Sequence, residues 1–321
     1  MAGPTTGPGK AAVTAVRVLT PITQPLDLAS TLDSGQCFRW RPEADGAWTG
    51  VLGGDVVRLR AASQGLLIES APTSPEQMVP RVMKYLRMDD DLPAIQRRLS
   101  VDPHMAQGVA AYPGLRLLRQ DPWETLAAFI LSSTSNIPRI RRTVELIAVS
   151  CGQAVTLDGM TRHTFPSPER LAQVGEAELR RLGCGFRAPY LEQAAQAVAT
   201  GQLPLSGFRG VRYQEAAEAL TALRGVGDKV ADCVMLFSLD RLEAFPVDRW
   251  VQRAMQEWYG AGPLKRYDDA RKWAWERFGQ DAGYANQYLF WRRRQGQGAA
   301  LHSQGLPLDP LAGPQSPKSA R

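Results

Sequence analysis

The chain has 321 residues, of which 44% are hydrophobic and 22% are charged, so it is long enough for a substantial core and two packed domains. Its 38 Lys and Arg residues exceed its 32 Asp and Glu residues by six, and this net charge of +6 suits a polyanionic partner. No apolar run has membrane-spanning length and the three histidines are scattered, which argues against a membrane-spanning protein and against a zinc site.

The N-terminal part of the chain predicts a small antiparallel sheet. Residues 1–12 are rich in Gly, Pro and Thr, and we expect disorder there, with order starting near Val13. Short apolar runs separated by turn signals such as Asp45-Gly46 predict a meander. The expected strands are residues 37–41, 48–52, 56–60 and 66–70. After them, Ser74-Pro75-Glu76-Gln77 is typical of a capping box and predicts a helix to about Met88.

Helices dominate the rest of the predicted structure. Proline directly after a capping residue, as in Asp121-Pro122 and Ser167-Pro168, indicates helix starts. The expected helices are residues 122–131, 138–149, a short one from 168, 188–200, 211–223, 228–239, 249–259, 267–278 and 284–294. The sequence thus predicts an α+β protein. Its parts are an N-terminal α+β domain with the antiparallel sheet at 13–115, a mostly α-helical domain at 116–298 and a flexible C-terminal tail at 299–321.

A helix-hairpin-helix pattern lies at about residues 211–239. Gly225 and Gly227, with Val226 between them, separate the two expected helices and allow a tight reversal. The reversal exposes main-chain N–H groups at the start of the second helix, where they can bind a phosphate without any side chain. These three residues are therefore predicted to grip the backbone of DNA.

Lys229 and Asp248 put an amine and a carboxylate at two helix starts. The positive end of the helix dipole disfavours the ammonium form of Lys229, and a neutral amine is a nucleophile. Lys is also rare in this chain, whereas Arg, which serves elsewhere, cannot be deprotonated for attack on carbon. We expect helix N–H groups to hold Asp248 ionised, so that it can orient the amine or stabilise positive charge on a sugar carbon.

Less specific interpretations of the same residues stay open at this point. Taken alone, Lys229 is a solvated surface cation and Asp248 is a helix N-cap. The hairpin also occurs in non-catalytic DNA-binding modules. A nucleotide-binding P-loop is set aside, because the glycine spacing differs and a helix, rather than a strand, precedes the hairpin.

With several other segments, these residues resemble the helix-hairpin-helix DNA glycosylases, and more narrowly the 8-oxoguanine DNA glycosylase/AP lyases. The resemblance extends over roughly residues 28–295. It rests on Asp33-Ser34-Gly35-Gln36-Cys37-Phe38-Arg39-Trp40, Leu131-Ser132-Ser133 with Asn136 and Arg139, Gly183-Cys184-Gly185-Phe186-Arg187, residues 225–233, Pro246-Val247-Asp248, and Ala282-Gly283-Tyr284 through Phe290. This ordered set is much more specific than a hairpin alone.

The resemblance implies a pocket for a base that has been flipped out of the duplex. Cys233 and Phe290 would form its two walls and replace the stacking that the base loses. The main-chain carbonyl of Gly35 would accept the N7–H that 8-oxoguanine has and guanine lacks. Asn286 stands where the family has a glutamine that reads the lesion, and its side chain is one methylene shorter. Without the resemblance, Cys233 and Phe290 would be core residues and Gly35 a turn glycine.

The resemblance also implies contacts to the strand opposite the lesion. Arg139 and Arg187 would reach the orphaned cytosine, and Phe186 would wedge into the gap in the stack. Otherwise Arg139 belongs to a solvated helix face and Phe186 is a loop aromatic packed inward. Thr134 replaces the family's asparagine, so we expect a shorter or absent contact to the cytosine and relaxed selectivity. Trp250 replaces the family's histidine, which puts a phosphate contact near the scissile sugar in question.

The implied function is that of a bifunctional DNA glycosylase/AP lyase, which excises 8-oxoguanine through a Lys229 Schiff base and β-elimination. It would act as a monomer on damaged duplex DNA without a required cofactor, with a cation possible at the hairpin carbonyls. Cys37, Cys151, Cys184 and Cys233 are too dispersed for an iron–sulfur cluster, and we expect reduced thiols in an intracellular protein, in the cytoplasm or nucleoid if bacterial. The alternatives are a glycosylase for another damaged base and a non-catalytic DNA-binding module.

Overall fold

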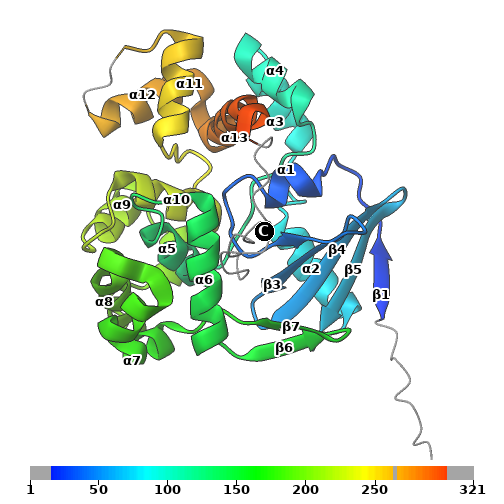
Figure 1. Cartoon of the computed structure of the whole chain (residues 1–321). Helices are drawn as coiled ribbons and strands as arrows, with labels where there is room; N and C mark the ends of the chain where they lie inside the picture. Colours follow the sequence, from blue (N-terminus) through cyan, green and yellow to red (C-terminus); the bar gives the residue numbers. More distant parts are fainter. Residues whose placement is uncertain (1–15, 263–265, 302–321) are drawn as a thin grey trace, which may run out of the picture.

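The computed structural model describes residues 16–262 and 266–301. It places a sheet at one side of the molecule and most of the helices at the other (Figure 1). The strands are β1 (Arg17–Thr20), β2 (Arg41–Pro42), β3 (Trp48–Leu52), β4 (Asp55–Ala62), β5 (Gly65–Ala71), β6 (Ala154–Leu157) and β7 (Met160–His163). The α-helices are α1 (Leu28–Leu32), α2 (Pro75–Tyr85), α3 (Leu92–Leu99), α4 (Pro103–Ala111), α5 (Pro122–Ile130), α6 (Ile137–Cys151), α7 (Pro168–Leu179), α8 (Ala188–Ala199), α9 (Tyr213–Thr221), α10 (Asp228–Ser238), α11 (Arg249–Tyr259), α12 (Tyr267–Phe278) and α13 (Ala282–Leu301). The predicted α+β class is confirmed.

The five-stranded sheet is antiparallel and has the strand order β1-β5-β4-β3-β2. Strands β2 to β5 follow one another in the chain and form the predicted meander. Strand β1, which was not predicted, pairs with β5 and places Arg17 opposite Glu69. The strand predicted at residues 37–41 is wrong, because Phe38 and Trp40 are buried in an irregular segment and the strand begins only at Arg41.

Helix α2 packs on the sheet and completes the N-terminal core. Leu59 of the sheet and Met78 of the helix are both fully buried in it. The helix begins at a proline as predicted, but the Ser74 side chain makes no capping hydrogen bond, so the predicted capping box is wrong. The helix also ends at Tyr85 rather than at about Met88.

From α5 onwards most helices follow the predicted bounds closely, but α13 runs from Ala282 to Leu301 rather than over residues 284–294. Helices α11 and α12 have the predicted limits, and α8 ends before Gly201, which adopts the left-handed φ of +74° that favours glycine. Three helices, α1, α3 and α4, and the β6–β7 hairpin were not predicted. The sequence held signals for two of these helices: Asp102 caps α4 directly before Pro103, and Asp91 caps α3 two residues before Pro93.

Helices α5, α10, α11 and α13 and one loop surround the interior where the residues of interest meet. Helix α10 is buried from Val230 to Ser238 and packs against α5. The two helices are neighbours in Figure 1. Helix α13 packs against α11 and α4, so a segment from the N-terminal part of the chain supports it. The loop that contains residues 33–38 follows α1 and reaches the same interior.

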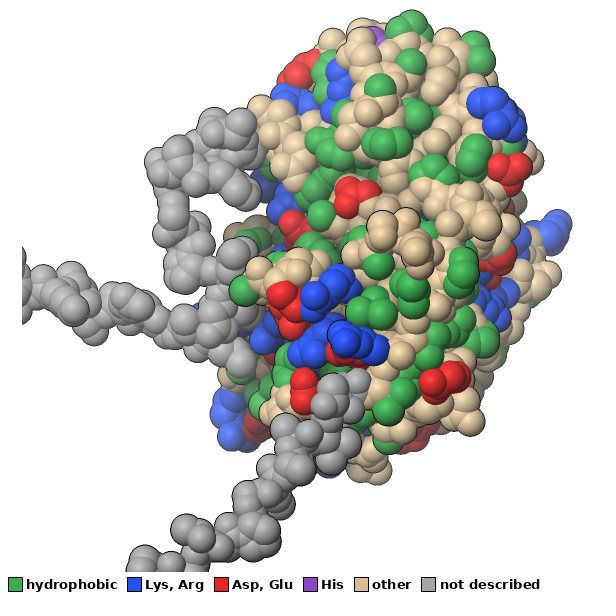
Figure 2. All heavy atoms as spheres, turned by 90° about the vertical axis from the view of Figure 1, so that its right-hand side faces the viewer, with side chains coloured by type: hydrophobic (Ala, Val, Ile, Leu, Met, Phe, Trp, Pro, Cys, Tyr) green, Lys and Arg blue, Asp and Glu red, His purple; other side chains and the backbone are tan. Residues whose placement is uncertain are grey.

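Charges are intermingled on the surface of the sheet part of the molecule. In the view of Figure 2, basic and acidic side chains lie side by side. Arg58 of the sheet forms two such ion pairs. Its Nε atom lies 3.1 Å from Glu43 Oε1, and its NH1 atom lies 2.9 Å from Glu69 Oε2. Within residues 16–262 and 266–301, no helix is both long and apolar enough to cross a membrane.

Candidate active site

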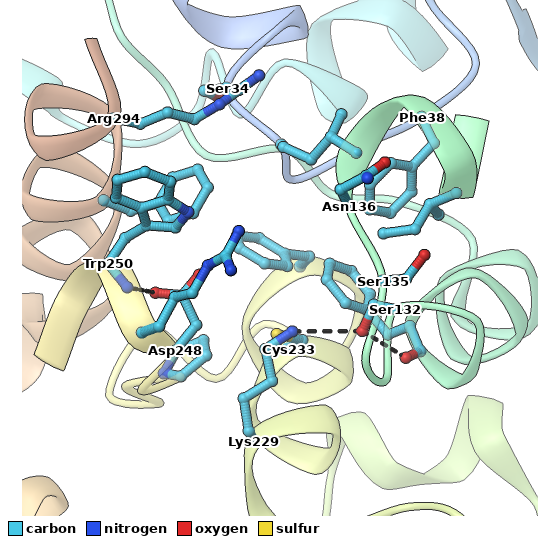
Figure 3. A pocket seen from close by; sticks show the side chains of 18 of the residues that line it. Ser34, Phe38, Ser132, Ser135, Asn136, Lys229, Cys233, Asp248, Trp250 and Arg294 are labelled. Atoms are coloured by element: carbon cyan, nitrogen blue, oxygen red, sulfur yellow. Dashed lines mark hydrogen bonds between the residues drawn. The ribbon is translucent and has the colours of Figure 1, made fainter. Parts of the chain in front are cut away.

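A cavity of about 240 Å³ lies where α5, α10, α11 and α13 meet the loop after α1 (Figure 3). It brings together residues from five separate stretches of the chain. Its walls include six residues of interest from the sequence: Gly35, Lys229, Cys233, Asp248, Asn286 and Phe290. Asp248 and Lys229 approach it from different helices, α11 and α10, and both side chains point into it.

Lys229 lies in the first turn of α10, directly after the N-terminal boundary at Gly227 and Asp228. Its Nζ atom lies 3.4 Å from Ser132 Oγ and 5.0 Å from the centre of the Phe129 ring. The Ser132 hydroxyl donates to Phe129 O at 2.6 Å, so its lone pairs remain for Lys229. The amine is thus held inside the cavity by a hydroxyl and an aromatic face, and the interpretation of Lys229 as a solvated surface cation is wrong.

Asp248 caps α11, as its position before the helix predicts. Its Oδ1 atom accepts hydrogen bonds from Trp250 N at 2.8 Å and Val251 N at 2.9 Å. Burial raises the pKa of Asp248 above its ordinary value, although these hydrogen bonds and the Lys229 charge act in the opposite direction. The expected effect of the helix N–H groups is therefore present, but desolvation outweighs it.

Cys233 and Phe290 line the cavity from α10 and α13. Cys233 lies one turn after Lys229, and burial raises the pKa of its thiol to about 12, so the thiol stays neutral. Gly35 has a φ of +78°, and a Cβ atom added to it would lie 3.1 Å from Phe290 Cε1. The glycine therefore lets the main chain of the loop pack closely against the Phe290 ring.

Two adjacent amides of α13, Asn286 and Gln287, are buried in the cavity wall. Asn286 Nδ2 donates to Pro246 O at 2.8 Å, which ties α13 to the segment before Asp248. Gln287 Nε2 donates to Ser34 O at 2.9 Å, which fixes the loop before Gly35. Each of these bonds uses one amide hydrogen, so Asn286 still has a second donor and its carbonyl oxygen for a ligand.

The residues predicted to contact the opposite strand lie outside the cavity lining. Arg187 is buried and donates to Ser133 O at 2.6 Å and Thr134 O at 2.9 Å. The Cζ atom of its guanidinium group lies 4.3 Å from the centre of the Phe186 ring. Phe186 is 52% exposed, so the alternative in which this ring packs inward is wrong. Arg139 is exposed on α6.

The hairpin between α9 and α10 has the tight reversal that the glycines predict. Gly225 has a φ of +86°, and a Cβ atom there would lie 2.4 Å from Tyr190 Cδ2. Val226 is buried, whereas a Cβ atom on Gly227 would meet no atom within 4 Å. In the part of the chain that the structure describes, no group of three His, Cys, Asp or Glu residues could hold a metal ion.

The sequence interpretation missed several residues of the cavity. Ser132 and Gln287 stand inside motifs that were recognised, but no role was given to them. Arg249 and Arg294 also line the cavity, and Arg294 NH1 lies 3.5 Å from Asp33 O. Arg294 lies four residues, or about one helical turn, after Phe290. This spacing is the sequence signal that places Arg294 on the same face of α13 as Phe290.

Comparisons with known proteins agree over most of the chain. The model of the 8-oxoguanine DNA glycosylase N-terminal domain matches residues 18–126, and that of the HhH-GPD superfamily base excision DNA repair proteins matches residues 127–280. The N-glycosylase/DNA lyase OGG1 of Arabidopsis thaliana is 32% identical over 300 residues, which cover 89% of this chain and 82% of that protein. The N-glycosylase/DNA lyase of Saccharomyces cerevisiae is 30% identical, with 83% and 82% covered.

A solved structure has the same fold. It is that of the Clostridium acetobutylicum 8-oxoguanine glycosylase/lyase with double-stranded DNA containing cytosine opposite 8-oxoguanine. The TM-score is 0.80 at 32% identity, and the match covers 85% of this chain and 93% of that one. From its two successive domains and its relatives, the chain belongs to the 8-oxoguanine DNA glycosylases of the helix-hairpin-helix base excision repair superfamily.

Proposed function

We propose that this chain excises 8-oxoguanine from duplex DNA and then cleaves the strand, with Lys229 as the nucleophile. The observation that carries the proposal is the placement of Lys229 and Asp248 in one cavity with Cys233 and Phe290. A flipped purine between the thiol and the ring would present its sugar to the amine. The family membership supports the same activity.

The chemistry begins with the amine form of Lys229. Its lone pair forms a bond to the sugar C1′ as the C1′–N9 bond breaks, and the electron pair of that bond leaves with the base, which takes up a proton. The transition state has oxocarbenium character, and the Asp248 carboxylate stabilises its positive charge. Asp248 reaches this position because α11 begins there, so capping and catalysis use the same carboxylate.

Strand cleavage follows from the same covalent bond. The Lys229 adduct opens to a Schiff base when the sugar ring C1′–O4′ bond breaks and O4′ is protonated. The iminium acidifies the C2′ proton, whose removal expels the 3′ phosphate by β-elimination. The two steps need only the lysine, a proton donor for the departing base and for O4′, and a proton acceptor for the amine and C2′ protons, so no cofactor is required.

Recognition divides between the cavity and the surface around it. Gly35 would accept the N7–H of the lesion through its main-chain carbonyl, and Asn286 would bind the Watson–Crick edge. Phe186, Arg139, Arg187 and the neighbouring Thr134 would meet the gap and the orphaned base.

The hairpin would provide a second grip on the duplex. The N–H groups of residues 225–227 would bind a phosphate, because they stand at the N-terminus of α10. With no cluster of acidic, His and Cys side chains in the described residues, a cation there would depend on main-chain carbonyls. No step of the reaction passes through it. One chain carries both the amine and the carboxylate, so a monomer would suffice.

The test is covalent trapping. Duplexes containing 8-oxoguanine opposite each normal base are incubated with the protein and borohydride, which reduces a Schiff base to a stable adduct. We expect an adduct with the wild-type chain and none with Lys229→Gln, which should still bind the lesion. Adduct formation by Lys229→Gln at the wild-type rate would refute the nucleophile assignment. Base release without any adduct, detected by alkaline cleavage, would indicate a glycosylase that lacks the lyase step.

A further inference from the structure

The peptide group between Pro246 and Val247, just before Asp248, is held at both of its polar atoms. Its carbonyl oxygen accepts a hydrogen bond from Asn286 Nδ2 at 2.8 Å, and its N–H donates to the Tyr267 hydroxyl at 3.0 Å. The two side chains come from different helices, α13 and α12. Because a peptide group is planar and rigid, contacts at both ends fix its orientation and thereby the path of the chain into Asp248.

Tyr267 also connects this peptide to the helix that carries Lys229. Its hydroxyl donates to Asp232 Oδ2 at 2.9 Å, and Asp232 is fully buried on α10, three residues after Lys229. Burial and the Asp232 charge raise the pKa of Tyr267 well above its ordinary value, so the hydroxyl keeps its proton and remains a donor. One hydroxyl group thus accepts from the Asp248 segment and donates to α10.

Arg271, one turn further along α12, makes the attachment of α12 to α10 rigid. Its Nε and NH2 atoms each lie 3.1 Å from a carboxylate oxygen of Asp232, and its NH1 atom lies 3.3 Å from Asp228 Oδ1. Asp228 and Asp232 lie on either side of Lys229 in the sequence. Two-pronged contacts between Arg and a carboxylate fix geometry as well as charge. Helix α12 is therefore firmly attached to the turn of α10 that presents the amine.

We infer that Tyr267 is a positioning residue for base excision, which sets the place of Asp248 relative to Lys229. The inference rests on the proposed function, because that function gives the two groups a shared transition state. Tyr267 lies outside the cavity lining and acts through the peptide before Asp248. A carboxylate that stabilises a developing charge must be placed to a fraction of an ångström, so release of this peptide should affect the rate more than the binding of DNA.

The chain offers a matched control at Tyr213. Its hydroxyl donates to Oδ1 of Asp232, the other oxygen of the same buried carboxylate. Tyr213→Phe and Tyr267→Phe each remove one phenolic hydroxyl and one hydrogen bond to Asp232. In the described residues, only the Tyr267 hydroxyl also accepts from Val247. A purely structural role in the Asp232 cluster predicts similar behaviour for the two variants, whereas positioning of Asp248 predicts a difference.

The experiment compares wild type, Tyr267→Phe and Tyr213→Phe in four measurements on the full chain. These are single-turnover excision of 8-oxoguanine opposite cytosine, affinity for the same duplex, cleavage of a duplex with a preformed abasic site, and thermal unfolding. We expect Tyr267→Phe to slow excision by about 10–100-fold. Its affinity and abasic-site cleavage should remain at wild-type levels, because neither requires charge stabilisation during base release. Tyr213→Phe should excise at the wild-type rate.

Two other results would overturn the inference. In the first, both variants lose the same amount of excision activity. In the second, Tyr267→Phe loses abasic-site cleavage and thermal stability to the same degree as it loses excision. Either result would mean that Tyr267 has only a structural role. The wild-type chain separates this failure from that of the proposed function. If wild type excises 8-oxoguanine and the two variants behave alike, only the positioning role fails. If wild type acts on neither duplex, the proposed function fails and the positioning role fails with it.

Discussion

The contact between Gly35 and Phe290 allows a sharp test of the base pocket by Gly35→Ala. The added methyl group has two effects. First, a φ of +78° is left-handed backbone, which costs a non-glycine residue about 1–2 kcal/mol in the free energy of unfolding. Second, the Cβ atom would lie 2.9 Å from Ile137 Cδ1 and 3.1 and 3.2 Å from two Phe290 ring atoms. The isoleucine methyl can rotate away, but the ring must move by a few tenths of an ångström.

Because Phe290 is a proposed wall of the base pocket, this shift should impair the fit of a flipped purine. We expect excision of 8-oxoguanine to fall about tenfold or more, as sub-ångström misplacement in a site commonly does. Cleavage of a preformed abasic site should persist, since no base has to enter the pocket. Single-turnover assays on the two duplexes, with chemical denaturation in parallel, measure both effects.

Gly46→Ala is the matched control, because Gly46 has a φ of +83° but a Cβ atom there meets nothing within 4 Å. Both variants should lose the stability that the left-handed backbone costs, Gly35→Ala should lose more because of the crowding, and only Gly35→Ala should lose excision. The reasoning that Gly35 sets the width of the pocket would be refuted if Gly35→Ala excised 8-oxoguanine at the wild-type rate and had the same free energy of unfolding as Gly46→Ala.

Two further predictions concern Asp248 and Thr134. Asp248→Asn should leave the free energy of unfolding nearly unchanged, because Asn caps helices as well as Asp, while excision falls by about 10²–10³-fold. Since burial raises the Asp248 pKa, its carboxylate takes up a proton at a higher pH than an ordinary Asp. As the pH is lowered, the wild-type excision rate should therefore begin to fall at a higher pH than the protonation of an ordinary Asp would cause. Identical pH–rate profiles for wild type and Asp248→Asn would contradict this role of Asp248. Thr134 has a φ of +50°, which is unfavourable for a β-branched residue and better tolerated by Asn, so Thr134→Asn should stabilise the chain by about 1 kcal/mol. The same change should raise the preference for cytosine opposite the lesion. Excision rates against the four opposite bases test this preference, and a denaturation curve tests the gain in stability. An unchanged preference or an unchanged stability would contradict the corresponding expectation.

Local signals in the sequence were sufficient to place most secondary structure, whereas Gly35, Cys233, Asn286 and Phe290 were expected at a pocket only through the resemblance to a known family. The glycines of the hairpin mark the start of α10 and the Asp248 cap marks the start of α11, and these starts bring Lys229 and Asp248 to the cavity. The limits lay in two places. The four-residue capping pattern at Ser74 was a valid local signal, but the side chain forms no such bond in the folded chain. A capping Asp followed by proline correctly indicated α5, yet the same signal was overlooked at Asp102.

Contacts between distant segments could not be predicted by such local rules. Asn286 bonds to a carbonyl 40 residues away, and Gln287 to one 253 residues away. Tyr267 had the appearance of an ordinary helix-start residue, because its partners Val247 and Asp232 come from two other elements. The positions of these side chains depend on how α12 and α13 pack, which no periodicity or motif states.

The burial of the cysteines has a consequence for the conditions under which this chain can operate. Burial raises the pKa of all four thiols, to about 12 for Cys37, Cys184 and Cys233 and above the ordinary value for Cys151. Peroxides and related oxidants react with thiolates rather than thiols, so these side chains present almost none of the reactive form at neutral pH. In the proposed base pocket, the same oxidants that produce the lesion should therefore attack the Cys233 sulfur slowly.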